Sequence, residues 1–424
     1  MPEESVLVKS SRAMSPELAA AISQVRRFIQ VACAETGSGS CAHELAQPAH
    51  EPLFNQLACE LFRLQFTHNK VYRQFCNARG VNPTNVCHWH QIPALPTAAF
   101  KDFDVTCLEP ARWTTIFISS GTTGQKQSRH FHNAESLALY EASLLPWFAR
   151  HVLPESTTAL DKGVSARTDK STDRWPMLIL TPTRADAPCS SLVYMFDSVR
   201  RVFGSPESEF FGRITPDGSW QLDTGALRVA LRTAAGSAKP VVLLGTAFAF
   251  VQLLDYMRKT GLVCSLPTGS RVVETGGYKG RVRQVARKEF YELITALLGV
   301  PQSHIVSEYG MCELGSQAYD IAVGRTGLSG IHTTAQTSAA VDSGLDRVFC
   351  FPPWTRACVV SPETGLEVSE GEVGLIRVFD LANVLSVMAI QTEDVAVRRR
   401  AGFELLGRAA TAELRGCSLL QLPD

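Results

Sequence analysis

The sequence predicts an α/β protein in which a large domain with mainly parallel sheets is followed by a β-rich C-terminal lobe. In residues 114–320, short apolar runs alternate with stretches of helical periodicity, a pattern typical of parallel strands covered by helices. After Tyr319 the helical periodicity stops, and short strands separated by Gly and Pro follow. We therefore divide the chain into a helical N-terminal region (1–113), an α/β core (114–320) and a β-rich C-terminal lobe (321–424).

Composition and charge exclude several classes of protein. The chain has 424 residues, of which 45% are hydrophobic and 19% charged, so its composition is that of a globular rather than a disordered protein. Lys plus Arg and Asp plus Glu both number 41, and this zero net charge disfavours nucleic acid as a partner. No apolar run is long enough for a membrane span, and the first residues lack the apolar segment of a signal peptide. We therefore expect a cytoplasmic protein without a membrane span.

The cysteines indicate reduced thiols rather than a disulfide framework. The chain has 12 Cys, scattered without a Cys-x-x-Cys pair. The densest group of metal-ligand types is Cys76, Cys87, His88 and His90, but the second close pair that a zinc site needs is missing. We expect a loop beside Trp89 at this place instead of a metal site.

Two periodic stretches predict the helices of the N-terminal region. Ser15 can cap a helix over residues 15–33, and Pro16 suits its first turn. A second helical stretch covers residues 53–79 and ends at Gly80. Several prolines exclude a long helix over residues 82–96, which we expect to form a loop.

The core and the lobe are predicted from shorter runs. In the core, a strand over residues 115–118 precedes a helix over residues 133–150. Further core strands are expected at 177–180, 241–244, 271–273 and 304–306, and further helices at 222–234, 248–258 and 282–298. The lobe strands are expected at 347–351, 357–360, 374–379, 395–398 and 403–406. A cleft between a parallel-sheet domain and a β lobe is a usual place for a small-molecule site.

A polar, glycine-containing loop after the first core strand is the strongest indication of chemistry. The loop consists of Ser119, Ser120, Gly121, Thr122, Thr123, Gly124, Gln125 and Lys126. Glycine lets the backbone approach a phosphate closely, the hydroxyls can donate hydrogen bonds, and Lys126 adds a mobile positive charge. Because Gly121 and Gly124 are only three residues apart, the loop does not fit the P-loop pattern of nucleotidases. The alternative interpretation is a flexible surface turn.

This loop resembles the phosphate loop of the adenylate-forming superfamily, which activates carboxylic acids with ATP as acyl-adenylates. Within that superfamily, the chain is similar to the acyl-protein synthetases of bacterial bioluminescence, also called long-chain-fatty-acid luciferin-component ligases. The similarity rests on an ordered series of segments at residues 92–101, 119–126, 191–195, 274–280, 307–317, 392–394 and 407–419. It implies ATP and Mg²⁺ as cofactors, an adenylate-forming-enzyme-like large domain and a nucleotide-binding role for the α/β core.

Glu313 is a candidate ligand for Mg²⁺. It comes shortly after the predicted strand 304–306, at the end of the strand where open parallel sheets place their ligands. Since Mg²⁺ needs only one or two protein carboxylates besides phosphates, a single Glu suffices. The alternative is a carboxylate that stabilises a helix N-terminus. The resemblance implies that Lys126 and Glu313 are catalytic, and that the four residues Tyr309, Gly310, Met311 and Cys312 contact the nucleotide.

Two further segments are implied to bind the nucleotide. The strands between Asp394 and Arg408 form a hairpin that returns both side chains to one end of the lobe. By similarity, Asp394 would hold the ribose hydroxyls and Arg408 the ribose or a phosphate; the alternative is a surface ion pair. Gly276 and Gly277 would let an adenine lie against the backbone.

The chain departs from the superfamily pattern in several respects. Cys312 stands where most relatives have Thr, and a thiol is a much weaker donor than a hydroxyl. Ala410 stands in place of an acidic hinge residue, and only a short tail follows Arg408, so we expect no full-length swinging C-terminal domain. By similarity, Cys417 in that tail would accept the acyl group; the alternative is one more small buried residue.

The resulting prediction is a ligase that activates a carboxylic acid, implied to be a fatty acid, as an acyl-adenylate and transfers it to a thiol, implied to be a protein cysteine. Two alternatives stay open. One is an acyl-CoA ligase resembling the phenylacetate type, and the other is a non-catalytic nucleotide-binding homologue. The expected partners are the acid and an acyl-accepting protein such as a reductase or a carrier. The sequence does not identify the acid or the final acceptor.

Overall fold

The computed structural model describes residues 14–35, 50–119, 126–156, 174–276, 286–323 and 347–408. The N-terminal helices are α1 (Pro16–Glu35), α3 (Glu51–His68) and α4 (Lys70–Asn77). The single helix expected over residues 53–79 is wrong, because the chain breaks at Asn69. This buried residue is extended, with φ −106° and ψ 104°, and its side chain accepts a hydrogen bond from the Tyr72 amide as the N-cap of α4.

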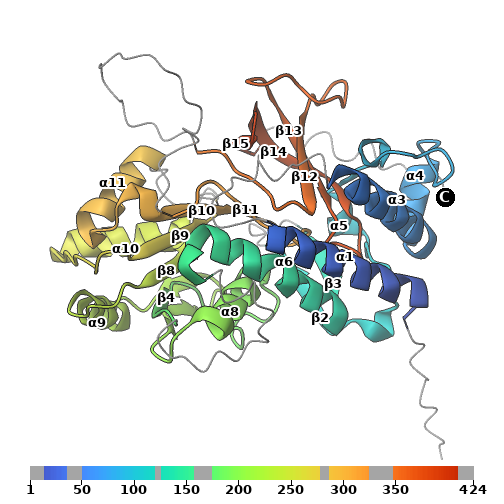
Figure 1. Ribbon diagram of the computed structural model, residues 1–424. Coiled ribbons are helices and arrows are strands. Elements are labelled where there is room, and N and C mark those ends of the chain that lie inside the picture. Colours follow the sequence, from blue (N-terminus) through green and yellow to red (C-terminus); the bar gives the residue numbers. More distant parts are fainter. Residues whose placement is uncertain are drawn as a thin grey trace, which may run out of the picture.

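A six-stranded sheet forms the centre of the molecule, in the order β11-β10-β9-β8-β4-β5 (Figure 1). Its parallel strands are β4 (Met177–Ile179), β5 (Glu209–Phe210), β8 (Val242–Thr246), β9 (Arg271–Thr275) and β10 (Ile305–Tyr309). At one edge, β11 (Ala318–Tyr319) pairs antiparallel with β10. The mainly parallel sheet predicted from the sequence is therefore confirmed.

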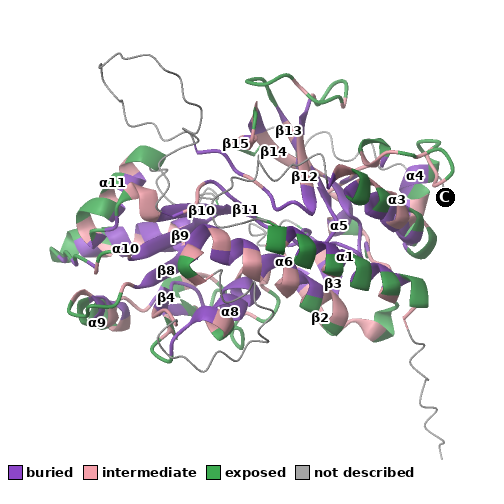
Figure 2. Ribbon diagram, in the orientation of Figure 1, coloured by how far each residue is buried: buried purple, intermediate pink, exposed green. Residues whose placement is uncertain are grey.

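Helices cover both faces of this sheet, because alternate residues of its strands are apolar on both sides. One set of helices packs in the core cluster on one side of the sheet, and a second set packs in the cluster on the other side. The former are α6 (Ala134–Val152) and α8 (Ser191–Phe203), and the latter are α9 (Thr224–Ala235), α10 (Ala247–Thr260) and α11 (Arg287–Leu298). Leu244 packs in the core with α6 and α8, whereas its neighbour Leu243 packs in the core with α10 and α11. The strands are buried and the outer faces of the helices are exposed (Figure 2).

The strand expected at residues 115–118 does not belong to the parallel sheet. It is β2 (Thr115–Ile118), which pairs antiparallel with β3 (Arg129–His132) in a separate hairpin. The polar loop, which begins at Ser119, therefore connects the two antiparallel strands of one hairpin. A second small hairpin is formed by β6 (Gly212–Ile214) and β7 (Trp220–Leu222).

The C-terminal lobe is an antiparallel sheet. Its strands are β12 (Thr355–Val360), β13 (Val373–Asp380), β14 (Ala389–Arg399) and β15 (Gly402–Arg408). On β14, the short strand β1 (Leu95–Pro96) adds in parallel, ahead of the short helix α5 (Ala99–Asp102). The stretch expected as a strand at 347–351 makes only isolated bridges from Phe349 and Cys350. Short 3₁₀ helices lie at Trp89–Gln91, Pro110–Arg112, Pro154–Ser156 and Gln302–His304.

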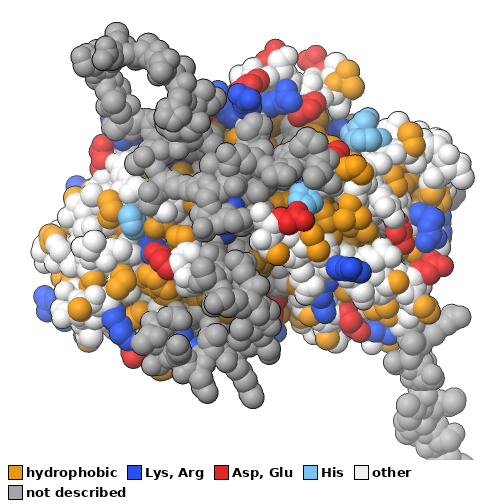
Figure 3. Space-filling view, viewed as in Figure 1, with side chains coloured by type: hydrophobic (Ala, Val, Ile, Leu, Met, Phe, Trp, Pro, Cys, Tyr) orange, Lys and Arg blue, Asp and Glu red, His pale blue; other side chains and the backbone are white. Residues whose placement is uncertain are grey.

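The distribution of charged side chains on the surface agrees with the equal numbers of basic and acidic residues. Figure 3 shows basic and acidic side chains scattered over the visible face without a large patch of either sign. Within the described ranges, no helix is both long and apolar enough to cross a membrane.

Candidate functional site

The candidate site begins where β9 and β10 end side by side. The two strands are parallel, and Glu308 lies opposite Thr275. The segments that follow, Gly276 after β9 and residues 310–313 after β10, therefore leave the sheet at the same edge. Gly276 has φ +76°, in the left-handed region that favours glycine.

The hairpin of the C-terminal lobe contacts this edge through Tyr309. The Tyr309 hydroxyl donates a hydrogen bond to Asp394 Oδ2 over 2.9 Å. Asp394 lies directly opposite Arg408 in the β14–β15 pairing, and Arg408 Nε is 3.4 Å from Asp394 Oδ1. The Asp394 side chain is 14% exposed and that of Arg408 is 66% exposed. Burial raises the pKa of Asp394, against the opposing effects of Tyr309 and Arg408. The structure thus brings together three of the residues that the sequence singled out.

Glu313 is held by contacts that the sequence did not predict. Its carboxylate is buried, and Cys312 Sγ lies 3.2 Å from Glu313 Oε2. The Asn383 amide donates to the Glu313 carbonyl oxygen over 2.8 Å. His130 Nδ1 lies 2.6 Å from the Cys312 carbonyl oxygen. Asn383 carried no recognisable signal, and His130 could have been suspected only because it follows the polar loop by a few residues.

Glu308 was also missed in the sequence. It is buried at the end of β10, where it accepts a hydrogen bond from the Thr275 hydroxyl. Burial raises the pKa of Glu308 to about 7, against the lowering effect of that hydroxyl. A Cβ atom at Gly310 would lie 2.4 Å from Glu308 Oε1, so a larger residue at this position would displace the Glu308 carboxylate.

Only the two ends of the polar loop are described. Ser119 forms a pair of contacts with Ser128: its amide donates to the Ser128 carbonyl, and its hydroxyl accepts from the Ser128 amide. Lys126 Nζ is 2.9 Å from Asp102 Oδ1 on α5, and both side chains are exposed. The remaining predicted loop residues, and two others, lie outside the described residues: Ser120, Gly121, Thr122, Thr123, Gly124, Gln125, Gly277 and Cys417.

The donor set around Glu313 fits Mg²⁺ better than a soft metal. Among the described residues, only the Cys312 thiol donates to the Glu313 carboxylate, which keeps oxygen lone pairs for a hard cation. The part of the chain that the structure describes has no group of three His, Cys, Asp or Glu side chains that could hold a metal ion. A cation at Glu313 would thus depend on oxygens from beyond the described side chains, such as phosphates.

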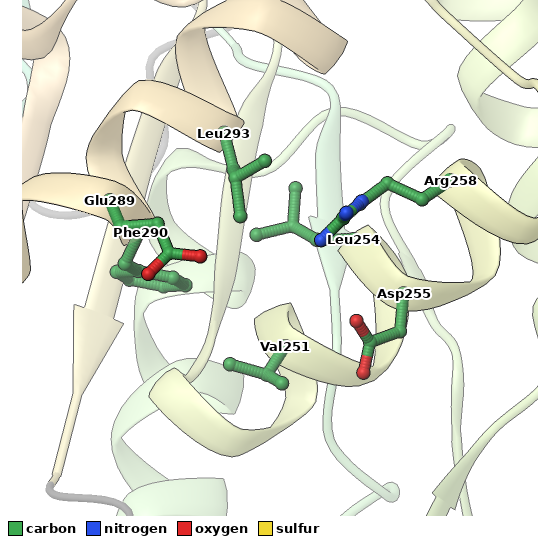
Figure 4. A pocket seen from close by; sticks show the side chains of 7 residues that line it. All are labelled: Val251, Leu254, Asp255, Arg258, Glu289, Phe290 and Leu293. Carbon is green, nitrogen blue, oxygen red and sulfur yellow. The ribbon is translucent and has the colours of Figure 1, made fainter. Parts of the chain in front are cut away.

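A shallow groove between α10 and α11 shares no residue with this site. Figure 4 shows the side chains that line it, which are Val251, Leu254, Asp255, Arg258, Glu289, Phe290 and Leu293. The lining is mostly apolar, and it lies on the face of the sheet that α9, α10 and α11 cover. It has no part in the candidate chemistry.

Comparison with known proteins identifies the family. The model of the family described as "Acyl-protein synthetase, LuxE" matches residues 177–422. The chain belongs to the acyl-protein synthetase (LuxE) family. Two relatives carry the name long-chain-fatty-acid–luciferin-component ligase. The protein of Vibrio harveyi is 22% identical over 87% of this chain and 86% of its own length. That of Aliivibrio fischeri is 22% identical over 86% of each chain.

Solved structures show the same fold for this family member. An open conformation of 2-hydroxyisobutyryl-CoA ligase, in complex with 2-HIB-AMP and CoA, superposes with a TM-score of 0.54. The alignment covers 84% of this chain and 74% of the other, at 11% sequence identity. The acyl-protein synthetase family member described here therefore has the fold of adenylate-forming enzymes, as the resemblance implied.

Proposed function

We propose that this protein activates a carboxylic acid with ATP as an acyl-adenylate and then transfers the acyl group to a thiol. The observation that carries the proposal is the contact of Tyr309 with Asp394. It joins the motif at the sheet edge to the hairpin of the lobe, so that residues far apart in the sequence face one site. Membership of the acyl-protein synthetase family supports the same reaction class.

The proposed binding roles follow from the chemistry of the side chains. Asp394 offers carboxylate oxygens to the ribose hydroxyls, and the exposed Arg408 fork offers donors to the ribose or a phosphate. The loop from Ser119 to Lys126 would hold phosphates, and Gly276 with Gly277 would lie against the adenine. Tyr309, Gly310, Met311 and Cys312 would complete the nucleotide site. Mg²⁺ at Glu313 would supply positive charge beside the phosphates.

In the first step, a carboxylate oxygen of the acid attacks the α-phosphorus of ATP and pyrophosphate leaves. Catalysis of this kind rests on positioning and on stabilisation of the developing charge. Lys126 Nζ is 2.9 Å from Asp102 Oδ1. Because this ion pair is exposed and therefore weak, the ammonium group would leave Asp102 and bind a phosphate.

In the second step, a thiolate attacks the carbonyl carbon of the acyl-adenylate, and AMP leaves. The names of the two relatives support a long-chain fatty acid as the substrate, and the description of the family supports a protein as the acceptor. We propose Cys417 as the thiol, which loses its proton before the attack. The family assignment does not favour the two alternatives, an acyl-CoA ligase and a non-catalytic nucleotide-binding protein.

The test is ATP-dependent release of pyrophosphate, measured with a panel of fatty acids of different chain length and with aromatic and short-chain acids. We expect release with fatty acids, and none when the acid or ATP is omitted. Absence of release with every acid, in protein that binds ATP, would establish the non-catalytic alternative. Transfer of the acyl group to coenzyme A, without labelling of any protein, would establish the acyl-CoA ligase.

A further inference from the structure

His130 connects the hairpin below the polar loop to the carboxylate motif. It lies on β3, is 2% exposed, and stands opposite Phe117 in the β2–β3 pairing, close to the stem of the loop. Its Nδ1 atom is 2.6 Å from the Cys312 carbonyl oxygen. Because a carbonyl oxygen only accepts hydrogen bonds, Nδ1 carries the hydrogen and donates it. The contact spans 182 residues of sequence.

The peptide groups of Cys312 and Glu313 need such donors. The strand β10 ends at Tyr309, so the carbonyl groups of these two residues lie beyond the hydrogen bonds of the sheet. His130 satisfies the Cys312 carbonyl, and the Asn383 amide satisfies the Glu313 carbonyl over 2.8 Å. One side chain from β3 and one from the turn between β13 and β14 therefore fix two consecutive residues.

A neighbouring histidine makes no such contact. His132 lies two residues along the same strand, is 4% exposed, and its ring centroid is 4.4 Å from that of His130. Its Nδ1 atom is 3.1 Å from Ser136 Oγ on α6 instead. The two histidines are thus both buried and close to each other, but they contact different groups. His130 contacts the Cys312 carbonyl and His132 the Ser136 hydroxyl.

We propose that His130 is a positioning residue for the Glu313 carboxylate. By holding the Cys312 carbonyl, it keeps the proposed Mg²⁺ ligand at a fixed place relative to the hairpin that carries the polar loop. A cation bound at Glu313 requires that this carboxylate keep a constant position. The inference rests on the proposed role of Glu313.

The test compares the affinity for ATP in Mg²⁺ with that in EDTA, measured by isothermal titration calorimetry. The ratio of the two affinities is the Mg²⁺ enhancement. His130→Phe keeps a ring but removes the donor, and we expect it to lower the enhancement about tenfold, as for the loss of one hydrogen bond. His132→Phe is the matched control and should keep the enhancement. His130→Asn should restore part of it, because its amide can donate at the position of Nδ1. Thermal unfolding checks that each variant folds, and His130→Leu replaces His130→Phe if the latter does not.

A double-mutant cycle separates this role from a merely structural one. If His130 acts through Glu313, His130→Phe should have no further effect on the enhancement when Glu313→Gln is already present. Independent effects of the two substitutions would overturn the inference, and so would a wild-type enhancement in folded His130→Phe. In both cases the proposed function would stand. Absence of any Mg²⁺ enhancement in the wild-type protein would instead overturn the role of Glu313, and the inference with it.

Discussion

The Glu313 side chain combines burial with few hydrogen-bond donors. It is 5% exposed, and among the described residues only the Cys312 thiol donates to its carboxylate. A buried carboxylate normally requires strong donors or a positive charge, and a thiol is a weak donor. The described residues do not supply such partners beyond this thiol, and a bound cation would.

We expect Glu313→Gln to lower ATP-dependent pyrophosphate release by roughly two orders of magnitude while the protein stays folded. The amide keeps the shape of the side chain and removes the charge that would hold Mg²⁺. Rates are to be compared at saturating ATP and acid, with the exposed Glu372→Gln as a control that should match the wild type. An unchanged rate in Glu313→Gln would make Glu313 a structural residue.

Glu308 gives a prediction for stability against pH. Burial raises its pKa to about 7, whereas a Glu in the unfolded chain titrates near pH ~4.3. The folded state therefore holds the proton more tightly, and the stabilisation present at low pH is lost as the pH rises toward 7. Glu308→Gln cannot lose this proton. We expect the free energy of unfolding of Glu308→Gln, relative to the wild type, to increase by about 2–3 kcal/mol between pH 5 and pH 8.

Urea denaturation at the two pH values measures this change. The exposed Glu292→Gln on α11 is the control and should show no such difference. Equal relative stabilities of Glu308→Gln at both pH values would mean that Glu308 titrates as an ordinary carboxylic acid.

At the scale of elements, the β14–β15 hairpin places Asp394 and Arg408 beside the end of β10 in the central sheet. The pairing places Asp394 opposite Arg408, and Tyr309 of β10 reaches Asp394 from the core. Both candidate nucleotide ligands thus belong to one element, and their separation is set by strand pairing.

We expect Asp394→Asn to raise the KM for ATP about tenfold or more, because the amide replaces one acceptor oxygen by a donor at the proposed ribose contact. The KM for the acid should change much less, since the acid does not contact the ribose. Steady-state pyrophosphate release gives both constants, and Asp255→Asn in the α10–α11 groove is the control. An equal rise in both KM values would indicate a general disturbance of the site.

The elements that the sequence predicted best are those with a strong local pattern. The strands β4, β8, β9 and β10 follow from short apolar runs, α6 follows from helical periodicity, and the β14–β15 hairpin follows from two runs separated by a turn. The two-residue strands β5 and β11 at the sheet edges were not predicted. The break at Asn69 was missed because a capping Asn inside an apolar helical pattern is a weak signal. The pairing of β2 with β3 was missed because residues 129–132 are rich in polar side chains, although the protein buries three of the four.

The candidate site was only partly predictable, for a similar reason. The segments that contain Asp394, Arg408 and Tyr309 are recognisable in the sequence. The sequence could also suggest that these three residues lie close together. His130 and Asn383 bind backbone carbonyl groups. Every residue has such a carbonyl group, so the residue types of the partners do not reveal these contacts. Such contacts depend on the packing of the whole fold.

At the scale of the molecule, the proposed chemistry needs a thiol that reaches the site where the adenylate forms. Arg408 ends the described chain at the contact with Asp394, and Cys417 follows nine residues later. An extended chain covers at most about 3.3–3.6 Å per residue, so this thiol can lie anywhere within roughly 30 Å of Arg408. Covalent geometry therefore permits a tail that begins at Arg408 to present its own cysteine at the proposed nucleotide site.

We expect Cys417→Ser to release pyrophosphate but to retain no labelled acyl group in a hydroxylamine-sensitive bond. The serine hydroxyl is a much poorer nucleophile than a thiolate, whereas Arg415 close to Cys417 in the sequence would favour the thiolate. The measurement is incubation with radiolabelled fatty acid and ATP, followed by denaturing electrophoresis with and without hydroxylamine. Cys189→Ser, at an exposed cysteine of the described chain, should label like the wild type. Undiminished hydroxylamine-sensitive labelling of Cys417→Ser would place the acceptor on a different residue, because only a thioester that does not involve Cys417 survives that substitution.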